Sequence, residues 1–312
     1  MAAELLDSSP VFQLRLRECA SAVARHVGWD VEDVLRRRPG SPTLDRVEVV
    51  QPVLWSVHVS LAALWMDNGL VPRAVIGQSQ GEIAAACVSG ALTLDDAARI
   101  ITLRSELFAQ TLVGTGGIAS IRLPAMDIEP LLGAYDGRLE IAGDIGPQTA
   151  TVAGDLIPLE HLVTVLNGRG VQATVIPASI PSHCFAIEPL RDRLIDALSV
   201  IRPLPTQIPM YSTVTAAVID GRELSADYWY DNARRPVLFQ PAMHNLLSHG
   251  ARVFVESSAH PVLTSAMTAT AQLAGIPVAV MGTLRRGHGD MTQFLTCLEQ
   301  VAASTPRVVS AA

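Results

Sequence analysis

A serine between two glycines is the residue of this sequence best placed for nucleophilic chemistry. Residues 77–81 read G-Q-S-Q-G, with the short apolar run 74–76 before them and an alanine-rich stretch after them. Where G-x-S-x-G joins a strand to a helix, the turn exposes the serine hydroxyl, here Ser79, and small glycines permit the strained backbone. The N–H of Gln80 would then donate to an oxyanion at the helix N-terminus. A capping serine in a glycine-rich turn is the alternative, but the flanking elements favour the nucleophile.

A serine hydroxyl is a weak nucleophile, so it needs a base that accepts its proton. The chain has eight histidines. His183 follows an expected strand where the chain would cross a cleft, and His260 stands at the end of another expected strand. The pattern of residues leaves these two open. His26 and His161, expected on helix surfaces, and His58, expected on a buried helix, are predicted to be structural.

An arginine lies on the apolar face of the helix predicted after the serine. Arg104 shares the helical spacing of Ile101 and Phe108, and no acidic residue stands three or four positions from it. The planar guanidinium group binds carboxylates in a bidentate manner, which predicts a substrate with a free carboxylate. The alternatives are an arginine that reaches solvent or one that pairs with an acid from another element.

The composition excludes several classes of protein. The 312 residues carry a net charge of −7 with scattered basic residues, which argues against a nucleic-acid surface. No lysine is present, so Schiff-base and P-loop lysine chemistry are excluded. Four dispersed cysteines form no CxxC pair, so neither a disulfide framework nor a metal site is expected. We find no signal-peptide pattern and no uninterrupted apolar stretch of membrane-spanning length, and we expect a cytoplasmic protein without a membrane partner.

The order of predicted elements indicates an α/β fold with an insertion. Long helices and short apolar strands alternate over 52–112 and 187–303, which predicts a parallel sheet. Thr93 and Asp96 form a capping-box pattern at the start of the helix that carries the arginine. Over 117–179 the elements are shorter and follow the order β-α-β-β-α-β, which is the ferredoxin-like order.

Seven stretches spread over nearly the whole chain form a combination that is far more specific than any one of them. They read ELLDSSPVF (4–12), VIGQSQGEIAAACVSGALTLDDAARIITLRS (75–105), SHCFAIEPLRDRL (182–194), YSTVT (211–215), DYWYDNARRPVLF (227–239), VFVESSAHPVLTSAM (253–267) and GTLRRG (282–287). Together they resemble the acyltransferase domain of a modular type I polyketide synthase. The chain is also similar to malonyl-CoA:acyl-carrier-protein transacylases in general.

The resemblance implies both a fold and a reaction. The fold is an α/β hydrolase-like large subdomain with a parallel sheet, over 1–115 and 183–312, and a ferredoxin-like small subdomain over 116–182. The reaction moves an acyl group from coenzyme A to the phosphopantetheine thiol of an acyl carrier protein. Expected partners are acyl-CoA, the carrier protein, and a ketosynthase with its linker in the same polypeptide or assembly. No bound cofactor is expected.

The resemblance also assigns roles to individual residues. Ser79 would be the nucleophile and His183 the general base and then acid, while Arg104 would hold the free carboxylate of the extender unit. The main-chain carbonyl of Asn232 would orient the catalytic imidazole and fix its tautomer. His260 belongs to a family segment and is expected to be structural.

Two features differ from the family pattern. Family members usually begin with a strand and a GQGSQ-type loop that supplies one oxyanion donor, whereas the printed chain starts at Met1 immediately before the 4–12 stretch. We therefore expect the printed chain to lack that donor, whose loss costs on the order of 10² to 10³ in rate. Gln78 stands where the family normally has histidine, and we expect it to be a polar, substrate-binding neighbour of the site.

The four residues that end in the catalytic histidine correlate with extender choice in this family. Methylmalonyl-type domains commonly show Tyr-Ala-Ser-His and malonyl-type domains His-Ala-Phe-His, whereas this chain reads Ile180-Pro181-Ser182-His183. Ser182 leaves room beside the α-carbon, Gln80 fits the branched-substrate class, and Ile180 makes the pocket larger and more apolar. We expect a 2-substituted malonyl unit bulkier than methylmalonyl, with broad tolerance, because apolar pockets discriminate by only about 1–3 kcal/mol per methylene.

Three other functions are compatible with the same residues. A methylmalonyl-selective acyltransferase differs only in the size of its pocket. A serine hydrolase or thioesterase would use the same serine to pass acyl groups to water. A catalytically inactive docking module would keep the fold without the reaction.

Overall fold

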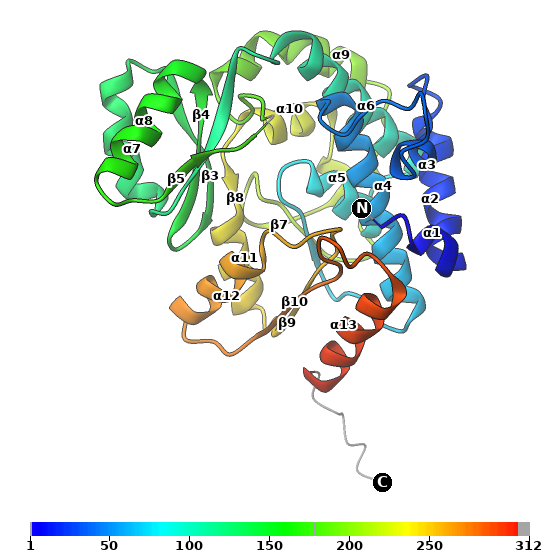
Figure 1. Ribbon diagram of the computed structural model, residues 1–312. Helices are drawn as coiled ribbons and strands as arrows, with labels where there is room; N and C mark the ends of the chain where they lie inside the picture. Colours follow the sequence, from blue (N-terminus) through cyan, green and yellow to red (C-terminus); the bar gives the residue numbers. More distant parts are fainter. Residues whose placement is uncertain (1, 178, 305–312) are drawn as a thin grey trace.

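Four helices precede the first strand of the computed structural model, which describes residues 2–177 and 179–304, and helices and strands are mixed along the rest of the chain (Figure 1). The first elements are α1 (Leu5–Ser8), α2 (Pro10–Val23), α3 (Val31–Leu35), α4 (Val47–Asp67), β1 (Val75–Ile76), α5 (Gly81–Val88) and α6 (Leu94–Thr111). The middle elements are β2 (Gly116–Ile121), α7 (Ala125–Leu132), η1 (Gly133–Tyr135), β3 (Leu139–Gly146), β4 (Thr149–Asp155), α8 (Leu156–Gly168) and β5 (Ala173–Val175). The last are η2 (Phe185–Leu190), α9 (Arg191–Leu198), β6 (Met210–Tyr211), β7 (Val218–Ile219), η3 (Gly221–Glu223), α10 (Ala226–Arg234), β8 (Val237–Leu238), α11 (Phe239–Ser248), β9 (Val253–Glu256), α12 (Thr264–Leu273), β10 (Ala279–Gly282) and α13 (Met291–Ser304). The predicted α/β class is confirmed.

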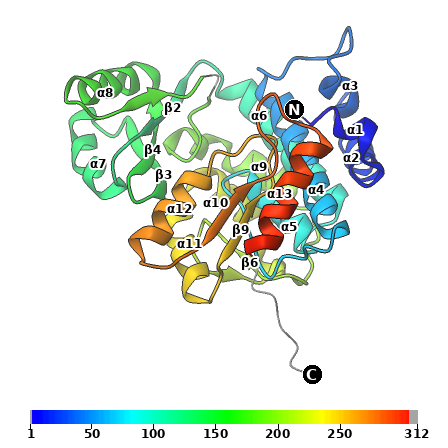
Figure 2. The same cartoon turned by 60° about the horizontal axis from the view of Figure 1, so that its bottom comes forward.

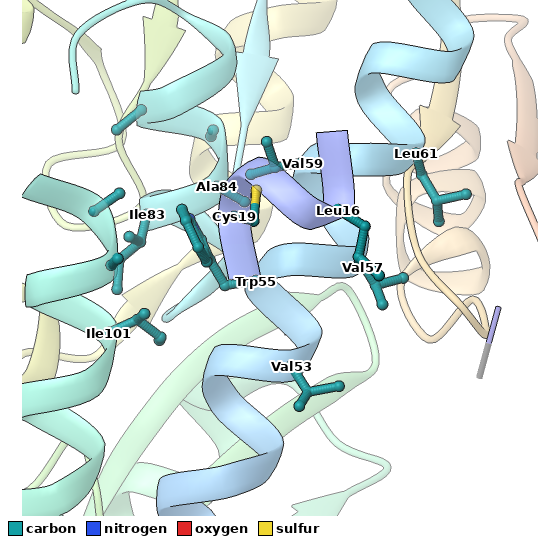
Figure 3. Packing of buried hydrophobic residues seen from close by; sticks show 14 of the residues in the cluster. Leu16, Cys19, Val53, Trp55, Val57, Val59, Leu61, Ile83, Ala84 and Ile101 are labelled. Atoms are coloured by element: carbon teal, nitrogen blue, oxygen red, sulfur yellow. The ribbon is translucent and has the colours of Figure 1, made fainter. Parts of the chain in front are cut away.

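Helix α4 is the centre of the largest apolar cluster. Trp55 from α4 lies beside Cys19 of α2 and near Ile83 of α5 and Ile101 of α6 (Figure 3). A helix that is apolar on most of its surface must be covered by other elements, and here α2, α5 and α6 cover it. Contrary to the sequence expectation, α4 is long and apolar enough to cross a membrane by length and composition alone. Because 61% of its apolar window is buried inside the protein, its place in the core accounts for that composition.

The single parallel sheet predicted for the larger part of the chain is wrong in detail. β1 pairs with β6 in parallel and β6 pairs with β7 in antiparallel orientation, so the first sheet is mixed. β9 and β10 form a separate parallel pair. Apolar side chains from both sheets, among them Val75 and Val253, still pack in one cluster. The two sheets therefore share one apolar cluster, but within the described residues no strand pairing joins them.

The short elements after residue 116 form a five-stranded sheet of their own. The strand order is β5-β2-β4-β3-β8, and the pairings among the first four strands are all antiparallel. The order of elements, β2-α7-β3-β4-α8-β5, is the predicted one. In both views this sheet, α7 and α8 lie apart from helices α1 to α4 (Figures 1 and 2). The fifth strand, β8, comes from the later part of the chain and runs parallel to β3, so the sheet extends beyond the predicted limit at residue 182.

The sequence next to two helices that carry site residues explains where these helices begin or end. The Thr93 side chain accepts a hydrogen bond from the Asp96 N–H at 3.0 Å, which confirms the predicted N-cap of α6. Helix α10 was not predicted from periodicity; Ser225 caps its start by accepting from the Tyr228 N–H. It ends at Arg234, before Arg235 turns to an extended backbone ahead of a proline.

Candidate active site

The turn between β1 and α5 holds Ser79 in a strained backbone conformation. Ser79 has a φ of +53°, which a residue with a side chain adopts only when its surroundings enforce it. A Cβ on Gly77 would lie 2.2 Å from the Glu82 nitrogen, so only glycine fits there. A Cβ on Gly81 would meet open space. The predicted requirement for glycine therefore holds before the serine and not after it.

Ser79 and His183 meet although 104 residues separate them in the sequence. The Ser79 Oγ lies 2.7 Å from His183 Nε2, and His183 Nδ1 lies 2.9 Å from the Arg235 carbonyl oxygen. Because a carbonyl only accepts, Nδ1 carries the proton and Nε2 is free to accept from the serine. Burial, together with the charge of Arg104, lowers the pKa of His183 to about 4, while the hydrogen bond to Arg235 opposes this. The imidazole is thus neutral at physiological pH, as a general base must be.

The expectation that the Asn232 carbonyl orients the imidazole is wrong. That acceptor is the carbonyl of Arg235, because Asn232 still lies inside α10 whereas Arg235 has left the helix with φ −80° and ψ 155°. Asn232 acts through its side chain instead. Its Oδ1 accepts from Arg104 Nη1 at 2.7 Å, and its Nδ2 donates to the Ser79 carbonyl oxygen at 3.2 Å.

Arg104 is buried beside the nucleophile. It is 2% exposed, its Nη2 lies 3.4 Å from Ser79 Oγ, and its guanidinium carbon lies 5.2 Å from the centre of the Phe108 ring. Its Nε has no hydrogen-bond partner among the described residues. Burial lowers the pKa of Arg104 to about 10, and the charge of Glu82 opposes this, so the group stays positive at neutral pH. Neither alternative from the sequence holds within the described chain, since Arg104 neither reaches solvent nor contacts an acid.

Sequence reasoning missed a buried acid behind this pair. Glu82 lies in the first turn of α5 and is 0% exposed. It accepts hydrogen bonds from the N–H and hydroxyl of Thr213, from the Tyr228 hydroxyl at 2.6 Å and from Asn232 Nδ2 at 2.9 Å. Burial raises the pKa of Glu82, and these hydrogen bonds oppose the rise. The available signal was a lone acid in an otherwise apolar helix, three residues after Ser79.

The two glutamines that flank the serine differ in what the structure assigns to them. Gln80 precedes the first residue of α5, which gives its N–H the predicted place at the helix N-terminus. Its Oε1 is buried without a partner in the described part of the chain. The carbonyl of Gln78 accepts from the Gly81 N–H at 2.8 Å, which closes the turn. No contact of the Gln78 side chain explains why this residue replaces histidine.

The residues before the histidine line the same region. Ile180, Pro181 and Ser182 are all buried, and Ile180 packs in one apolar cluster with Phe108, the ring beneath Arg104. Phe108 therefore connects Ile180, the predicted pocket residue, with Arg104, the predicted carboxylate-binding residue.

The other histidines lie away from the serine. His260 accepts from the Arg286 N–H at 3.3 Å, and His161 contacts a tyrosine hydroxyl at 3.1 Å in the five-stranded part. Burial lowers the pKa of His58 to about 4 within α4. The residues that the structure describes hold no cluster of three or more His, Cys, Asp or Glu side chains suited to a metal ion. His183 is therefore the base that the geometry offers.

Comparison with known proteins gives one consistent result. A family model described as "Acyl transferase domain" matches residues 1–308. Polyketide synthase GfsE of Streptomyces halstedii is 46% identical over 303 residues, which is 97% of this chain but only 8% of that protein. The acyltransferase domain from module 8 of the salinomycin polyketide synthase matches with a TM-score of 0.95 and 45% identity, covering 97% of this chain and 72% of that one. The acyl transferase domain of SpnD, in complex with 2-(pent-4-yn-1-yl)malonyl, matches with a TM-score of 0.86 and 25% identity, covering 96% of this chain and 72% of that one.

Proposed function

Because this chain belongs to the acyl transferase domain family, we propose that it transfers a 2-substituted malonyl group from coenzyme A, through Ser79, to an acyl carrier protein in polyketide biosynthesis. One observation carries the proposal: the Ser79 hydroxyl lies 2.7 Å from a neutral base, His183, and 3.4 Å from a buried cation, Arg104. A nucleophile, its base and a carboxylate-binding group therefore stand around one point where the acyl group would sit.

The reaction has two half-steps that use the same residues. His183 Nε2 accepts the serine proton as Ser79 Oγ attacks the thioester carbonyl, and the Gln80 N–H at the start of α5 donates to the oxyanion. The tetrahedral intermediate collapses, the C–S bond breaks, and the coenzyme A sulfur takes the proton from His183. The phosphopantetheine thiol of the carrier protein then gives its proton to His183 and attacks the acyl-serine ester. Collapse of the second intermediate returns the proton to Ser79.

Arg104 supplies selection for a carboxylated acyl group. Its Nη1 is occupied by Asn232, whereas Nε has no partner in the described chain and Nη2 makes only the long contact with Ser79. A carboxylate bound to these two donors would satisfy a buried cation that otherwise lacks an acidic contact. Such binding also orients the acyl group on Ser79 and favours transfer to the carrier protein over hydrolysis of the acyl-serine ester.

The residue types at 180 and 182 support an acyl unit larger than methylmalonyl. Isoleucine at 180, in place of the tyrosine of methylmalonyl-type domains, removes a ring and a hydroxyl. Serine at 182, in place of the phenylalanine of malonyl-type domains, leaves room beside the α-carbon of the acyl group. The related SpnD domain, solved with a long 2-substituted malonyl group, is compatible with such a substrate on this fold. We place the substrate in the alkylmalonyl or arylalkylmalonyl class, with some leakage to smaller units.

Exchanging Ile180 and Pro181 is expected to change the size of the acyl group that the protein prefers. In Ile180→Tyr/Pro181→Ala, the added ring should fill the pocket and shift the preference about tenfold toward methylmalonyl-CoA. The measurement is competition among malonyl-CoA, methylmalonyl-CoA and longer 2-alkylmalonyl-CoA esters, with adducts on Ser79 quantified by intact mass. Ile157→Tyr, at a residue 79% exposed on α8, is the control. An unaltered profile contradicts the size argument, and a wild-type preference for methylmalonyl-CoA supports the methylmalonyl-selective alternative.

Architecture and surroundings follow as further parts of the proposal. We propose that 1–115 with 183–312 form a hydrolase-like subdomain and that 116–182 form a ferredoxin-like one; the strand order β5-β2-β4-β3 supports the latter. We propose that the domain works in the cytoplasm without a bound cofactor, beside a ketosynthase and its linker in the same assembly.

A further inference from the structure

Two opposite charges are buried behind the serine, and neither is in contact with the other. Among the described residues, Glu82 is the only buried carboxylate and Arg104 the only buried guanidinium. The charge of Glu82 favours the cationic form of Arg104, although no ion pair joins them. The Asn232 side chain stands between them and contacts both.

The Asn232 amide can adopt only one orientation at this place. Its Oδ1 accepts from Arg104 Nη1 at 2.7 Å, and its Nδ2 donates to Glu82 Oε2 at 2.9 Å and to the Ser79 carbonyl at 3.2 Å. A flipped amide would set donor against donor at Arg104 and acceptor against acceptor at Glu82. The contact with Arg104 therefore keeps the amide nitrogen toward Glu82, and the contact with Glu82 keeps the amide oxygen toward Arg104.

Besides Asn232, three donors from two residues bind the Glu82 carboxylate. Thr213 donates to Glu82 through its N–H and its hydroxyl, and Tyr228 donates through its hydroxyl at 2.6 Å. Tyr228 lies in α10, the same helix as Asn232, so Glu82 joins the first turn of α5 to α10. A carboxylate bound by this many donors is held rigidly. Glu82 should therefore keep its position when a ligand binds the Arg104 guanidinium, which it reaches through Asn232.

We propose that Glu82 is a positioning residue that determines selectivity for carboxylated acyl groups, because through Asn232 it holds the Arg104 guanidinium beside Ser79. The inference rests on the proposed function and names the residue that sets its substrate class. It differs from a purely structural role in one consequence. Loss of the Glu82 charge should slow the loading of acyl groups that bear a carboxylate. The loading of acyl groups that lack a carboxylate should stay nearly unchanged.

The test compares two thioesters that differ only in the carboxylate: ethylmalonyl-CoA and butyryl-CoA. Acylation rates of Ser79 are measured by intact mass for the wild type and for Glu82→Gln, which keeps the size of the side chain and removes its charge. We expect the ethylmalonyl rate to fall about 100-fold and the butyryl rate to change less than about threefold. Tyr228→Phe removes one donor and keeps the charge, so its ratio of the two rates should stay within about threefold of the wild type.

Three outcomes overturn the inference or its basis. Equal losses for both esters in Glu82→Gln mean a structural role, and wild-type rates for both esters mean that Glu82 has no role in loading. A wild type that loads neither ester removes the proposed function, and this inference with it. If Glu82→Gln does not unfold cooperatively, Asn232→Ala cuts the same connection with three donors left on Glu82. Because Asn232→Ala also removes the donor to the Ser79 carbonyl, the required result is a fall in the ratio of the ethylmalonyl rate to the butyryl rate, whatever loss both rates share.

Discussion

Replacing His183 with Gln is expected to slow acylation of Ser79 by about 10³-fold, the largest loss of any single change near the site apart from removal of the serine. The amide cannot accept and return a proton, and general acid–base catalysis contributes roughly 10²–10⁴ in rate. Both half-reactions should suffer, because His183 Nε2, 2.7 Å from Ser79 Oγ, is the proton acceptor that both use. The measurement is single-turnover acylation with a 2-alkylmalonyl-CoA, followed by intact mass.

The pH profile provides the control for that variant. Since the pKa of His183 is lowered to about 4, the neutral base predominates above that value, and the wild-type rate should fall only as the pH drops toward 4. His183→Gln should lose this dependence together with the rate. His161→Gln, in the five-stranded part, should retain both. A variant of His183 that keeps the wild-type rate would contradict the assignment of the base.

Replacing Arg104 with Ala is expected to reverse the preference for carboxylated substrates. Loading of a 2-alkylmalonyl group should fall about 100-fold, because its carboxylate would lose the buried cation beside the serine. Loading of acetyl and butyryl groups should rise relative to it, since the desolvated charge that disfavours an apolar acyl end is gone. Competition between the two classes of CoA ester, read as adduct masses, measures the ratio.

Arg99 offers a matched control on the same helix. Arg99→Ala removes an arginine from α6 at a position whose side chain has no contact with Ser79 or Asn232, so both loading rates should match the wild type. If acetyl loading in Arg104→Ala is unchanged relative to malonyl-type loading, Arg104 does not bind the carboxylate. Thermal unfolding of both variants separates this result from a loss of fold.

The sequence contained enough local information to predict the nucleophile and its helix. The glycine at 77, the alanine-rich segment and the capping pattern at Thr93 each act within a few residues, so their consequences can be read without coordinates. The apolar spacing around Arg104 predicted a buried cation for the same reason. The choice of His183 over His260 needed the family resemblance, because the pairing spans 104 residues.

The parts that could not be predicted depend on where helices end and how sheets divide. The imidazole is oriented by Arg235, because the backbone turns extended at that residue; no residue type requires a carbonyl there. The hydrogen bonds of Glu82 come from residues more than 130 positions away, so its spacing from Ser79 only hinted at a role. The separate pairing of β9 with β10 likewise depends on tertiary packing and not on the apolar pattern of either strand.

The fate of the acyl-serine tests the central claim most directly. Wild-type protein is acylated with a 2-alkylmalonyl-CoA, freed of excess ester, and divided between buffer and buffer with a phosphopantetheinylated carrier protein. A transferase should keep an adduct that maps to Ser79 in buffer alone, and should lose it rapidly as the carrier protein gains the same mass. Rapid release of free acid without the carrier protein would identify a hydrolase, and a folded protein that forms no adduct with any ester would contradict the account altogether.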